Sequence, residues 1–244
     1  MLVLDRLLAA LEVRVDAFAL CEICPGWRLT FGPGEEPSVH YVLAGSGTMR
    51  LPKGAALLLD QDVFAVLPKG IPHGFETAGG GGREVRHPGN VRAGDAGLGG
   101  AVREIRAGEG SDCLRIACGT VRASCGGRLG LFDHLREPIA ENFAAEPLRE
   151  RFQALLDELA TPAIGTQALT EGFLKQALVL VLRRQAGAKG RSLPWLAALQ
   201  DARLAPALGA MLDHPSRPFT LEGLAAITGM SRSAFAEHFA ATLG

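Results

Sequence analysis

The sequence has little net charge and no long apolar run. Its 244 residues carry a formal net charge of −1, so the chain lacks the strongly basic composition of a protein that coats nucleic acid or an anionic membrane. Its longest apolar run, residues 177–182, is far too short to cross a bilayer. We therefore expect a cytoplasmic protein with no membrane partner.

The apolar N-terminus does not have the pattern of a signal peptide. Asp5, Arg6 and Glu12 interrupt the stretch MLVLDRLLAALEV, and no clear small-residue cleavage site follows. An amphipathic helix explains the pattern better, because the leucines recur at helical spacing. The leucines on this face are Leu4, Leu7, Leu8 and Leu11.

Cysteine is scarce, and its number is odd. Five cysteines in a chain of this length do not make a secreted disulfide framework, so the sequence predicts free thiols in the cytosol. Cys21 and Cys24 lie three apart in a predicted strand, and their thiols converge only if Pro25 begins a turn. The same objection applies to Cys113 and Cys118. We expect buried, inert thiols rather than a metal or redox pair.

The sequence also lacks the common catalytic and nucleotide-binding motifs. It has no Gly-x-Ser-x-Gly elbow, no dinucleotide-binding fingerprint and no phosphate-binding P-loop. The glycine-rich stretch at residues 78–100 predicts an irregular loop instead. We therefore expect neither nucleophilic catalysis nor a bound cofactor.

The first half of the chain has the pattern of a β protein. Short apolar or alternating runs are separated by Gly, Pro and Asp, which is typical of an antiparallel sandwich or barrel. The predicted strands are residues 14–23, 27–31, 39–43, 48–51, 55–59, 63–67, 101–107 and 113–122.

The second half, from about residue 130, has helical periodicity. Residues 148–159 place their apolar side chains on one face, and a further helix is expected over residues 193–212. Residues 170–184 are apolar on nearly all sides, so this helix is expected to be buried between neighbours or at a subunit interface. Strands followed by helices predict an α+β chain with segregated parts, and we expect a homodimer.

The last 28 residues, from Arg217 to Gly244, predict a helix-turn-helix. Thr220 is a good N-cap for a helix beginning at Leu221, and Gly229 with Met230 makes a tight turn. Ser231 caps a second helix, whose first turns enter the major groove in a helix-turn-helix. The small core between the two helices is expected to hold Leu221, Leu224, Ala225, Phe235 and Phe239.

The amino-acid sequence of this stretch resembles the first helix-turn-helix of the AraC/XylS family of transcriptional regulators. The run LA…GMSRSAF…F…LG carries the resemblance, which implies double-stranded DNA as a partner and a second helix-turn-helix after residue 244. The predicted DNA-binding residues are Ser231, Arg232, Ser233, Glu237 and His238. Many members have two arginines where Glu237 and His238 stand, so this chain departs from them in its capacity for phosphate contact.

Two earlier segments resemble the motifs of the cupin barrel. They are GEEPSVHYVL, which begins at Gly34, and PKGIPH, which ends at His73. The resemblance implies metal ligands at four positions, of which this chain keeps His40 and His73. Val42 stands where a second His would be, and a Ser-Gly pair stands in place of the Glu. Because a catalytic metal has at least three protein ligands, we expect no metal, and His40 and His73 are the only candidates for one.

Together the two resemblances imply a regulator with a cupin-type sensor. The expected division is a cupin-like β-barrel at residues 1–130, a helical connector at 131–213 and an incomplete AraC-type DNA-binding domain at 214–244. An unidentified small effector is expected in the barrel interior, near Trp27, His40, Val42 and His73. Two alternatives stay open: a cupin-type metal-dependent enzyme, and a ligand-binding module that does not bind DNA.

Overall fold

The computed structural model describes residues 3–77, 79, 81–87, 103–125, 129–133, 135–187, 193–214 and 216–243. These residues divide into two compact units, which are described separately. The first, which we call the helical unit, consists of Met1–Glu12, Ser124–His134 and Leu178–Gly244. The second, which we call the sheet unit, consists of Val13–Ala123 and Leu135–Ala177.

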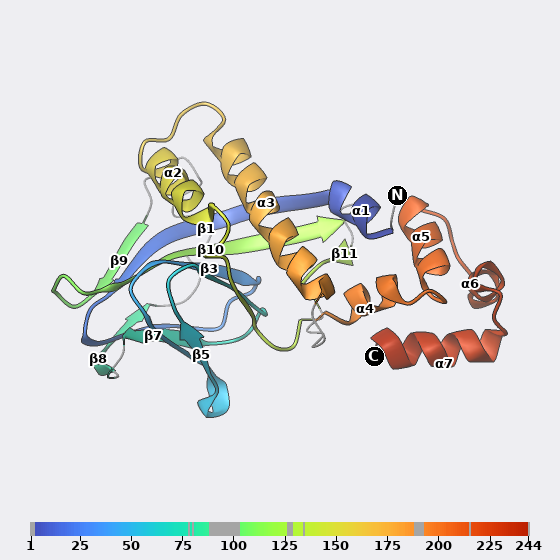
Figure 1. The fold of residues 1–244 in the computed structure, drawn as a ribbon, viewed down its shortest axis with the longest axis horizontal. Helices are drawn as coiled ribbons and strands as arrows, with labels where there is room; N and C mark the ends of the chain where they lie inside the picture. Colours follow the sequence, from blue (N-terminus) through green and yellow to red (C-terminus); the bar gives the residue numbers. More distant parts are fainter. Residues whose placement is uncertain are drawn as a thin grey trace. The chain divides into compact units, whose positions relative to one another are not determined.

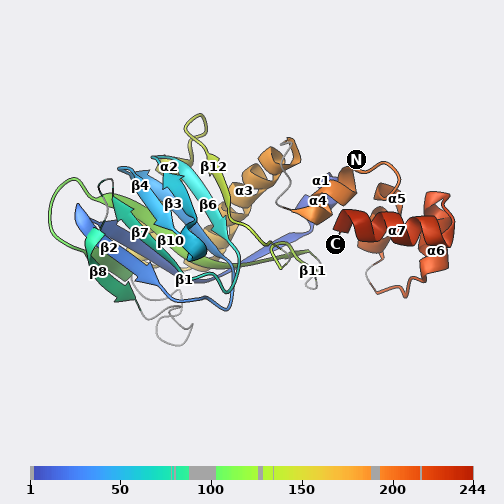
Figure 2. The same cartoon turned by 90° about the horizontal axis from the view of Figure 1, so that it is seen from below.

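Two β-sheets form the body of the sheet unit (Figures 1 and 2). The larger sheet has the strand order β12-β6-β3-β10-β1-β9, with β11 paired to β10. The smaller has the order β5-β4-β7-β2-β8. The strands of the larger sheet are β1 (Leu11–Ile23), β3 (Ser38–Ala44), β6 (Val63–Leu67), β9 (Arg103–Ala107), β10 (Leu114–Cys125), β11 (Leu129–Gly130) and β12 (Ile139–Asn142). Those of the smaller are β2 (Gly26–Phe31), β4 (Gly47–Arg50), β5 (Ala56–Leu59), β7 (His73–Thr77) and β8 (Gly81–His87).

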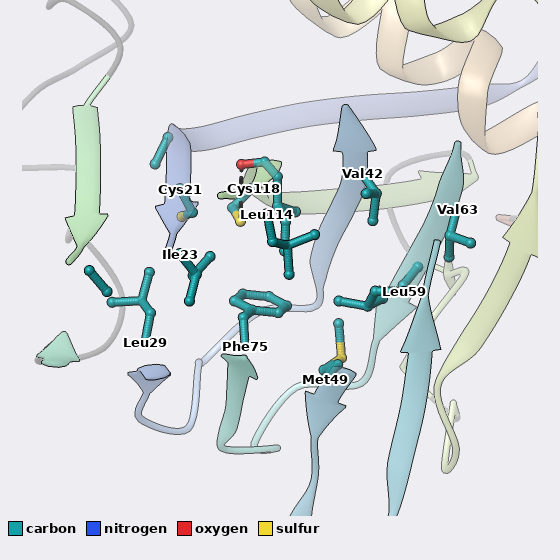
Figure 3. Close-up of a cluster of buried hydrophobic side chains, with 14 of the residues drawn as sticks. Cys21, Ile23, Leu29, Val42, Met49, Leu59, Val63, Phe75, Leu114 and Cys118 are labelled. Atoms are coloured by element: carbon teal, nitrogen blue, oxygen red, sulfur yellow. Dashed lines mark hydrogen bonds between the residues drawn. The ribbon is translucent and has the colours of Figure 1, made fainter. Parts of the chain in front are cut away.

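The inner faces of the two sheets meet in one apolar core (Figure 3). Side chains two residues apart point to the same face of a strand, so each strand contributes every second residue. Ile23, Val42 and Leu114 come from the larger sheet, and Met49 and Phe75 come from the smaller. All five are buried. The two sheets are separate in their strand pairing, so the described residues form a two-sheet sandwich rather than the closed barrel that the sequence predicts.

Helices cover the outer face of the larger sheet. Tyr41, between the inward-facing His40 and Val42 on β3, points outward and stacks on Phe152 of α2 (Leu148–Ala160), with ring centroids 4.2 Å apart. Phe173 of α3 (Thr166–Gly187) contacts the Phe152 ring edge-on, with ring centroids 4.8 Å apart. Such aromatic pairs contribute about 0.5–1.5 kcal/mol beyond the area that they bury.

A polar network fastens α2 to the sheet beneath it. Asp62, in the turn before β6, is buried and accepts a hydrogen bond of 2.7 Å from the hydroxyl of Tyr41. Arg149 of α2 donates to both carboxylate oxygens of Asp62. Hydrogen bonds from Arg149 hold the pKa of Asp62 below its usual value, although burial opposes them. Arg149 itself is 49% exposed, so only the carboxylate side of this pair is buried.

The helical unit combines the two ends of the chain. Its helices are α1 (Val3–Ala9), α4 (Pro194–Gln200), α5 (Ala205–Asp213), α6 (Leu221–Thr228) and α7 (Arg232–Leu243), together with the last part of α3. Arg6 of α1 pairs with Asp213 of α5, with 2.5 Å between nitrogen and oxygen. Trp195 of α4 donates its indole N–H to the carbonyl of Leu131, at 2.9 Å. No described helix is long and apolar enough to cross a membrane.

Most predicted strands and helices are confirmed, with several differences, among them the short strands β11 and β12, which were not predicted. The stretch at residues 78–100 contains strand β8, and its remainder from residue 88 lies outside the described residues. Strand β7 was not predicted, because the run HGFET has too few apolar residues. The helix predicted over residues 193–212 is two helices, α4 and α5, separated by a turn at Asp201. The predicted N-terminal helix ends at Ala9, and Leu11 begins β1.

Two of the five cysteines are not free thiols. Cys24 and Cys113 form a disulfide, whereas Cys21, Cys118 and Cys125 keep their thiols and are buried. The expectation of five free thiols is therefore wrong for this pair. Its physical reason is a turn at Pro25, in which the N–H of Trp27 donates to the carbonyl of Cys24 at 3.1 Å. Cys24 then faces a distant part of the chain rather than its neighbour Cys21.

The two compact units divide the chain differently from the three segments expected from the sequence. Residues 1–12 and 124–134 lie in the helical unit, and α3 contributes to both units. The functional division at residues 130 and 213 stays a prediction.

We predict that Arg149→Met lowers the free energy of unfolding of the sheet unit by about 1–3 kcal/mol, because the buried carboxylate of Asp62 loses its charged partner. Urea denaturation at pH 7 measures the change. Arg151→Met on the same helix is the control, since the bond of Arg151 to Gln176 is exposed and its loss costs less than about 0.5 kcal/mol. Equal effects of the two variants would contradict the prediction.

Candidate functional site

The helix-turn-helix forms as the sequence predicts, because each of its boundaries is fixed locally. The hydroxyl of Thr220 accepts from the N–H of Gly223 at 3.1 Å, which caps α6. Gly229 ends that helix with φ 68°, a left-handed conformation that glycine adopts without strain. The hydroxyl of Ser231 then accepts from the N–H of Ala234 at 3.2 Å and caps α7. The core between the helices contains the five predicted apolar side chains.

The first turn of α7 presents polar side chains to solvent. Ser231, Arg232, Ser233 and Glu237 are all exposed. Arg232 forms an ion pair of 3.2 Å with Glu222 of α6, and the two side chains are 67% and 63% exposed. An exposed pair of this kind contributes only about 0–1 kcal/mol, so the guanidinium is easily released to another partner.

His238, the fifth predicted DNA-binding residue, lies in a different environment. Its Nε2 is 2.6 Å from a carboxylate oxygen of Asp201, and its Nδ1 is 3.1 Å from a guanidinium nitrogen of Arg203. Burial by itself raises the pKa of Asp201, but hydrogen bonds from the backbone N–H of Arg203 and from His238 lower it below its usual value. The ring of His238 therefore fastens α7 to the segment between α4 and α5. Its role in DNA binding stays a prediction.

The structure brings together the two histidines that the cupin motifs predict. His40 on β3 and His73 on β7 come from the two facing sheets, and their ring centroids are 4.9 Å apart. Phe75 contacts both rings edge-on, and Phe31 stacks on His73 at 5.3 Å. Neither phenylalanine was predicted from the sequence, although each lies at an inward-facing position of its strand.

Each of these histidines uses one ring nitrogen and leaves the other without a partner. Nε2 of His40 is 2.9 Å from the hydroxyl of Ser38, and Nδ1 of His73 is 3.2 Å from the carbonyl of Ile71. Nδ1 of His40 and Nε2 of His73 are buried and have no hydrogen-bond partner. Unpaired buried polar atoms are costly, so these two nitrogens are the part of the sandwich interior best suited to receive a polar ligand.

Burial keeps both rings neutral at physiological pH. It lowers the pKa of His40 well below the usual 6.5, and the neighbouring His73 lowers it further. Burial also lowers the pKa of His73 to about 4, against a smaller opposing effect of its bond to the Ile71 carbonyl. A ligand at this site therefore meets two uncharged imidazoles, each able to accept or donate one hydrogen bond according to its tautomer.

The other two predicted effector-binding residues lie in and beside the core between the sheets. Val42 is 1% exposed and packs in the core between the sheets. Trp27 is only partly buried, and the guanidinium of Arg83 lies over its ring at 5.5 Å from the centroid. Trp27 therefore borders the same core at a different place.

The donor set does not fit the catalytic metal of the cupin motifs. His40 and His73 offer two free nitrogens, but Val42 supplies no third ligand. Among the described residues, no group of three or more His, Cys, Asp or Glu side chains is placed to hold a metal ion. A catalytic metal takes three protein ligands, so we derive no chemistry through a metal.

We predict that the stability of the sheet unit falls as the pH is lowered from 6.5 toward 4. Histidines of the unfolded chain take up protons near pH 6.5, whereas His73 does so near pH 4 in the fold and His40 well below 6.5. The unfolded state therefore binds more protons in this window, and each ring lowers the free energy of unfolding by up to about 1.4 kcal/mol per pH unit.

Urea denaturation between pH 7.5 and 4.5 tests this expectation. The double variant His40→Gln, His73→Gln should lose most of the slope in this window. Phe75→Leu, which removes a contacting ring but no titrating group, should lower stability at every pH and keep the slope. An unchanged slope in the double variant would show that other groups carry it.

Comparison with known proteins agrees with a cupin domain followed by a helix-turn-helix. A model of the cupin family matches residues 3–187. The chain is 24% identical over 243 residues to an uncharacterised HTH-type transcriptional regulator of Haemophilus influenzae, covering 99% of this chain and 78% of that protein. It is 25% identical over 226 residues to the RCS-specific HTH-type transcriptional activator RclR of Escherichia coli, covering 90% and 68%.

Among solved structures, an apo form of ToxT from Vibrio cholerae matches 96% of this chain and 75% of its own, with 5% identity and a TM-score of 0.41. The resemblance to regulators of the AraC type with a cupin sensor is confirmed by the cupin match and the named relatives. With a cupin match at residues 3–187 and a helix-turn-helix after it, the chain belongs to the cupin family and is similar to relatives named HTH-type transcriptional regulators.

Proposed function

We propose that this chain is a one-component transcription regulator in which a cupin sensor controls a helix-turn-helix that reads double-stranded DNA. The observation that carries the proposal is the capped helix α7, whose first turn presents Ser231, Arg232 and Ser233 to solvent. In a helix-turn-helix this part of the second helix contacts base edges in the major groove. The named relatives, which are HTH-type transcriptional regulators, support the proposal.

Arg232 is our candidate for direct base recognition. An arginine that contacts O6 and N7 of a guanine contributes about 1–3 kcal/mol of discrimination against other bases. Its exposed pair with Glu222 holds the side chain in the free protein and gives way at little cost. Ser231 and Ser233 are placed for phosphate or base contacts, and Glu237 lies one turn further along α7.

The effector site is proposed between the two sheets, at the unpaired nitrogens of His40 and His73. These neutral rings suit a small uncharged or weakly polar organic molecule, surrounded by the aromatic side chains of Phe31 and Phe75. An effector changes DNA binding only by favouring one arrangement of sensor and reader over another. The segments 1–130, 131–213 and 214–244 are assigned to sensing, connection and DNA reading, and α3 is assigned to a homodimer interface.

A regulator that reads chromosomal DNA works in the cytoplasm. The alternative of a metal-dependent cupin enzyme is disfavoured, because the described residues place no third ligand beside the two histidines. The alternative of a ligand-binding module without DNA binding is distinguished from our proposal by experiment. It predicts that the full-length gene product enriches no sequence from a random duplex pool.

We predict that Arg232→Ala relaxes sequence preference by a factor of about 5–150 at one base position. Selection from a random duplex pool with the full-length gene product gives the preferred sequence, and fluorescence anisotropy on that duplex and its single-base variants gives the ratio. Arg183→Ala on α3 is the control, because Arg183 is exposed and lies outside the helix-turn-helix. An unchanged preference in Arg232→Ala would overturn the assignment of this residue.

A further inference from the structure

The disulfide between Cys24 and Cys113 closes one end of the sandwich. Cys24 follows directly on β1, and Cys113 directly precedes β10, with a sequence separation of 89. The N–H of Cys24 also donates to the carbonyl of Ala107, the last residue of β9, at 2.9 Å. The bond therefore fastens residues 108–113, which connect β9 to β10, onto the end of β1.

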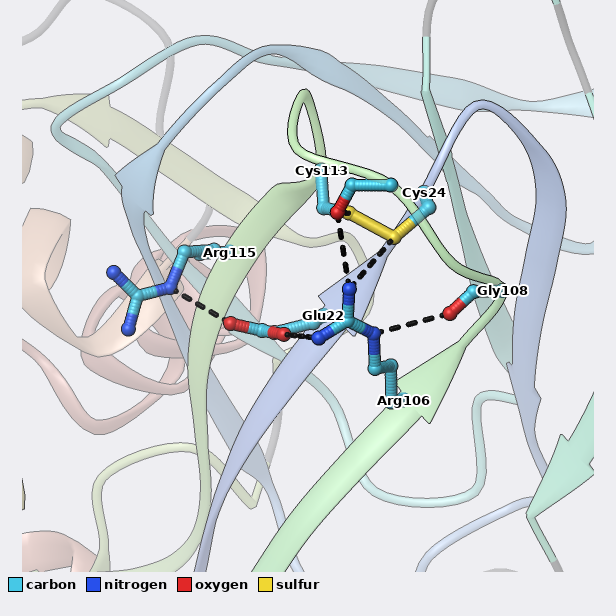
Figure 4. A network of polar contacts seen from close by, with 7 residues as sticks. Glu22, Cys24, Arg106, Gly108, Cys113 and Arg115 are labelled. Carbon is cyan, nitrogen blue, oxygen red and sulfur yellow. Dashed lines mark hydrogen bonds and ion pairs between the residues drawn. A yellow bond between two sulfur atoms is a disulfide. The ribbon is translucent and has the colours of Figure 1, made fainter.

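A guanidinium lies beside this disulfide (Figure 4). One terminal nitrogen of Arg106 is 3.8 Å from Sγ of Cys24 and 3.0 Å from the carbonyl of Gly110. Its Nε donates to the carbonyl of Gly108 at 3.0 Å, and its other terminal nitrogen pairs with Glu22 at 3.0 Å. The three contacts to oxygen hold the cation in place whether or not the sulfur carries a charge.

The fastened segment covers a tryptophan of the sensor. Gly108 has φ 88°, and a Cβ at this position would lie 2.3 Å from the ring of Trp27. This close approach requires glycine, because a side chain would displace either the ring or the segment. The disulfide, the segment 108–113 and the indole ring of Trp27 therefore form one packed arrangement at the border of the sandwich core.

We propose that Cys24–Cys113 is a reversible redox switch that sets the packing of residues 108–113 on Trp27. This inference rests on the proposed function in one respect: a protein that reads chromosomal DNA works in a compartment that keeps thiols reduced. Disulfides there are usually transient and redox-responsive rather than permanent. The geometry supplies the second reason, since a leaving thiolate is stabilised by an adjacent cation and Arg106 contacts Cys24.

The reductive step is thiol–disulfide exchange with a small-molecule thiol. Its thiolate attacks Sγ of Cys113, which belongs to the more exposed residue, at 9% against 0% for Cys24. The S–S bond breaks, and Cys24 leaves with the electron pair as a thiolate beside Arg106. A second small thiolate attacks the mixed disulfide at the small-molecule sulfur and releases Cys113. The protein gains two electrons and two protons, the small thiols lose them and form their own disulfide, and the reverse sequence closes the switch.

The neighbouring thiols do not form a comparable pair. Cys21 and Cys118 are both buried in the core between the sheets. Burial raises the pKa of Cys118 well above its usual value, and contact with Cys21 raises it further. A neutral, buried thiol is a poor nucleophile, so these two cysteines serve as the internal comparison.

The inference is tested on the 244-residue chain by counting its thiols. The protein is incubated in glutathione buffers in which the fraction of oxidised glutathione decreases. After a denaturing quench with N-ethylmaleimide, peptide mass mapping should find three alkylated cysteines under oxidising conditions, namely Cys21, Cys118 and Cys125, and five under reducing conditions. Trp27 emission, measured in a Trp195→Phe background, should shift to longer wavelength over the same range. The experiment uses no DNA, so its outcome is independent of the proposed DNA reading.

Variants of Arg106 and of the two cysteines test whether these residues cause the redox response. Arg106→Gln should slow reduction about threefold or more, and Arg106→Lys should restore part of the rate, because a cation beside the leaving thiolate accelerates exchange. Cys24→Ser with Cys113→Ser should give the emission of the reduced protein in every buffer. Three free cysteines in every buffer, five in every buffer, or a Trp27 response that survives the double variant would each overturn the inference.

Discussion

The alternation of side chains along β3 is the constraint on which the sheet unit depends. His40 and Val42 point into the sandwich, and Tyr41 between them points to the helices. One strand therefore builds the candidate effector site on one face and anchors α2 on the other. A shift of its register by one residue would put the histidine ring against Phe152 and the tyrosine into the apolar core. The buried bond from Tyr41 to Asp62 opposes such a shift, because only one register satisfies both groups.

The helix-turn-helix could be predicted in detail because its determinants are local. Thr220, Gly229 and Ser231 each act within three or four residues, so their caps and turn can be recognised from the sequence. The pair of His40 and His73 was also predictable, since both belong to motifs with known spacing. The spacing could not show that Ser38 and the Ile71 carbonyl each occupy one nitrogen and leave the other unpaired. That arrangement, rather than the presence of histidine, defines the site.

Contacts between distant segments could not be predicted. The partners in the Asp62–Arg149 pair are 87 residues apart, and those in the Cys24–Cys113 disulfide are 89 apart. Neither pair leaves a periodic signal, because each depends on how two elements meet rather than on the pattern within one. The surroundings of His238 show the same limit, since its helix position is correct but its contacts with Asp201 and Arg203 come from the packing of α7.

The smaller sheet has an edge strand, and this affects the behaviour of the protein in concentrated solution. Strand β5 ends that order, and its Leu58 is 78% exposed. An edge strand with an exposed apolar side chain is a template for pairing with another chain. Pro52 and Lys53 precede β5 and Asp60 follows it, which is the way that natural sequences protect such strands from aggregation. These flanking residues are therefore constrained by solubility, although they contribute nothing to the core.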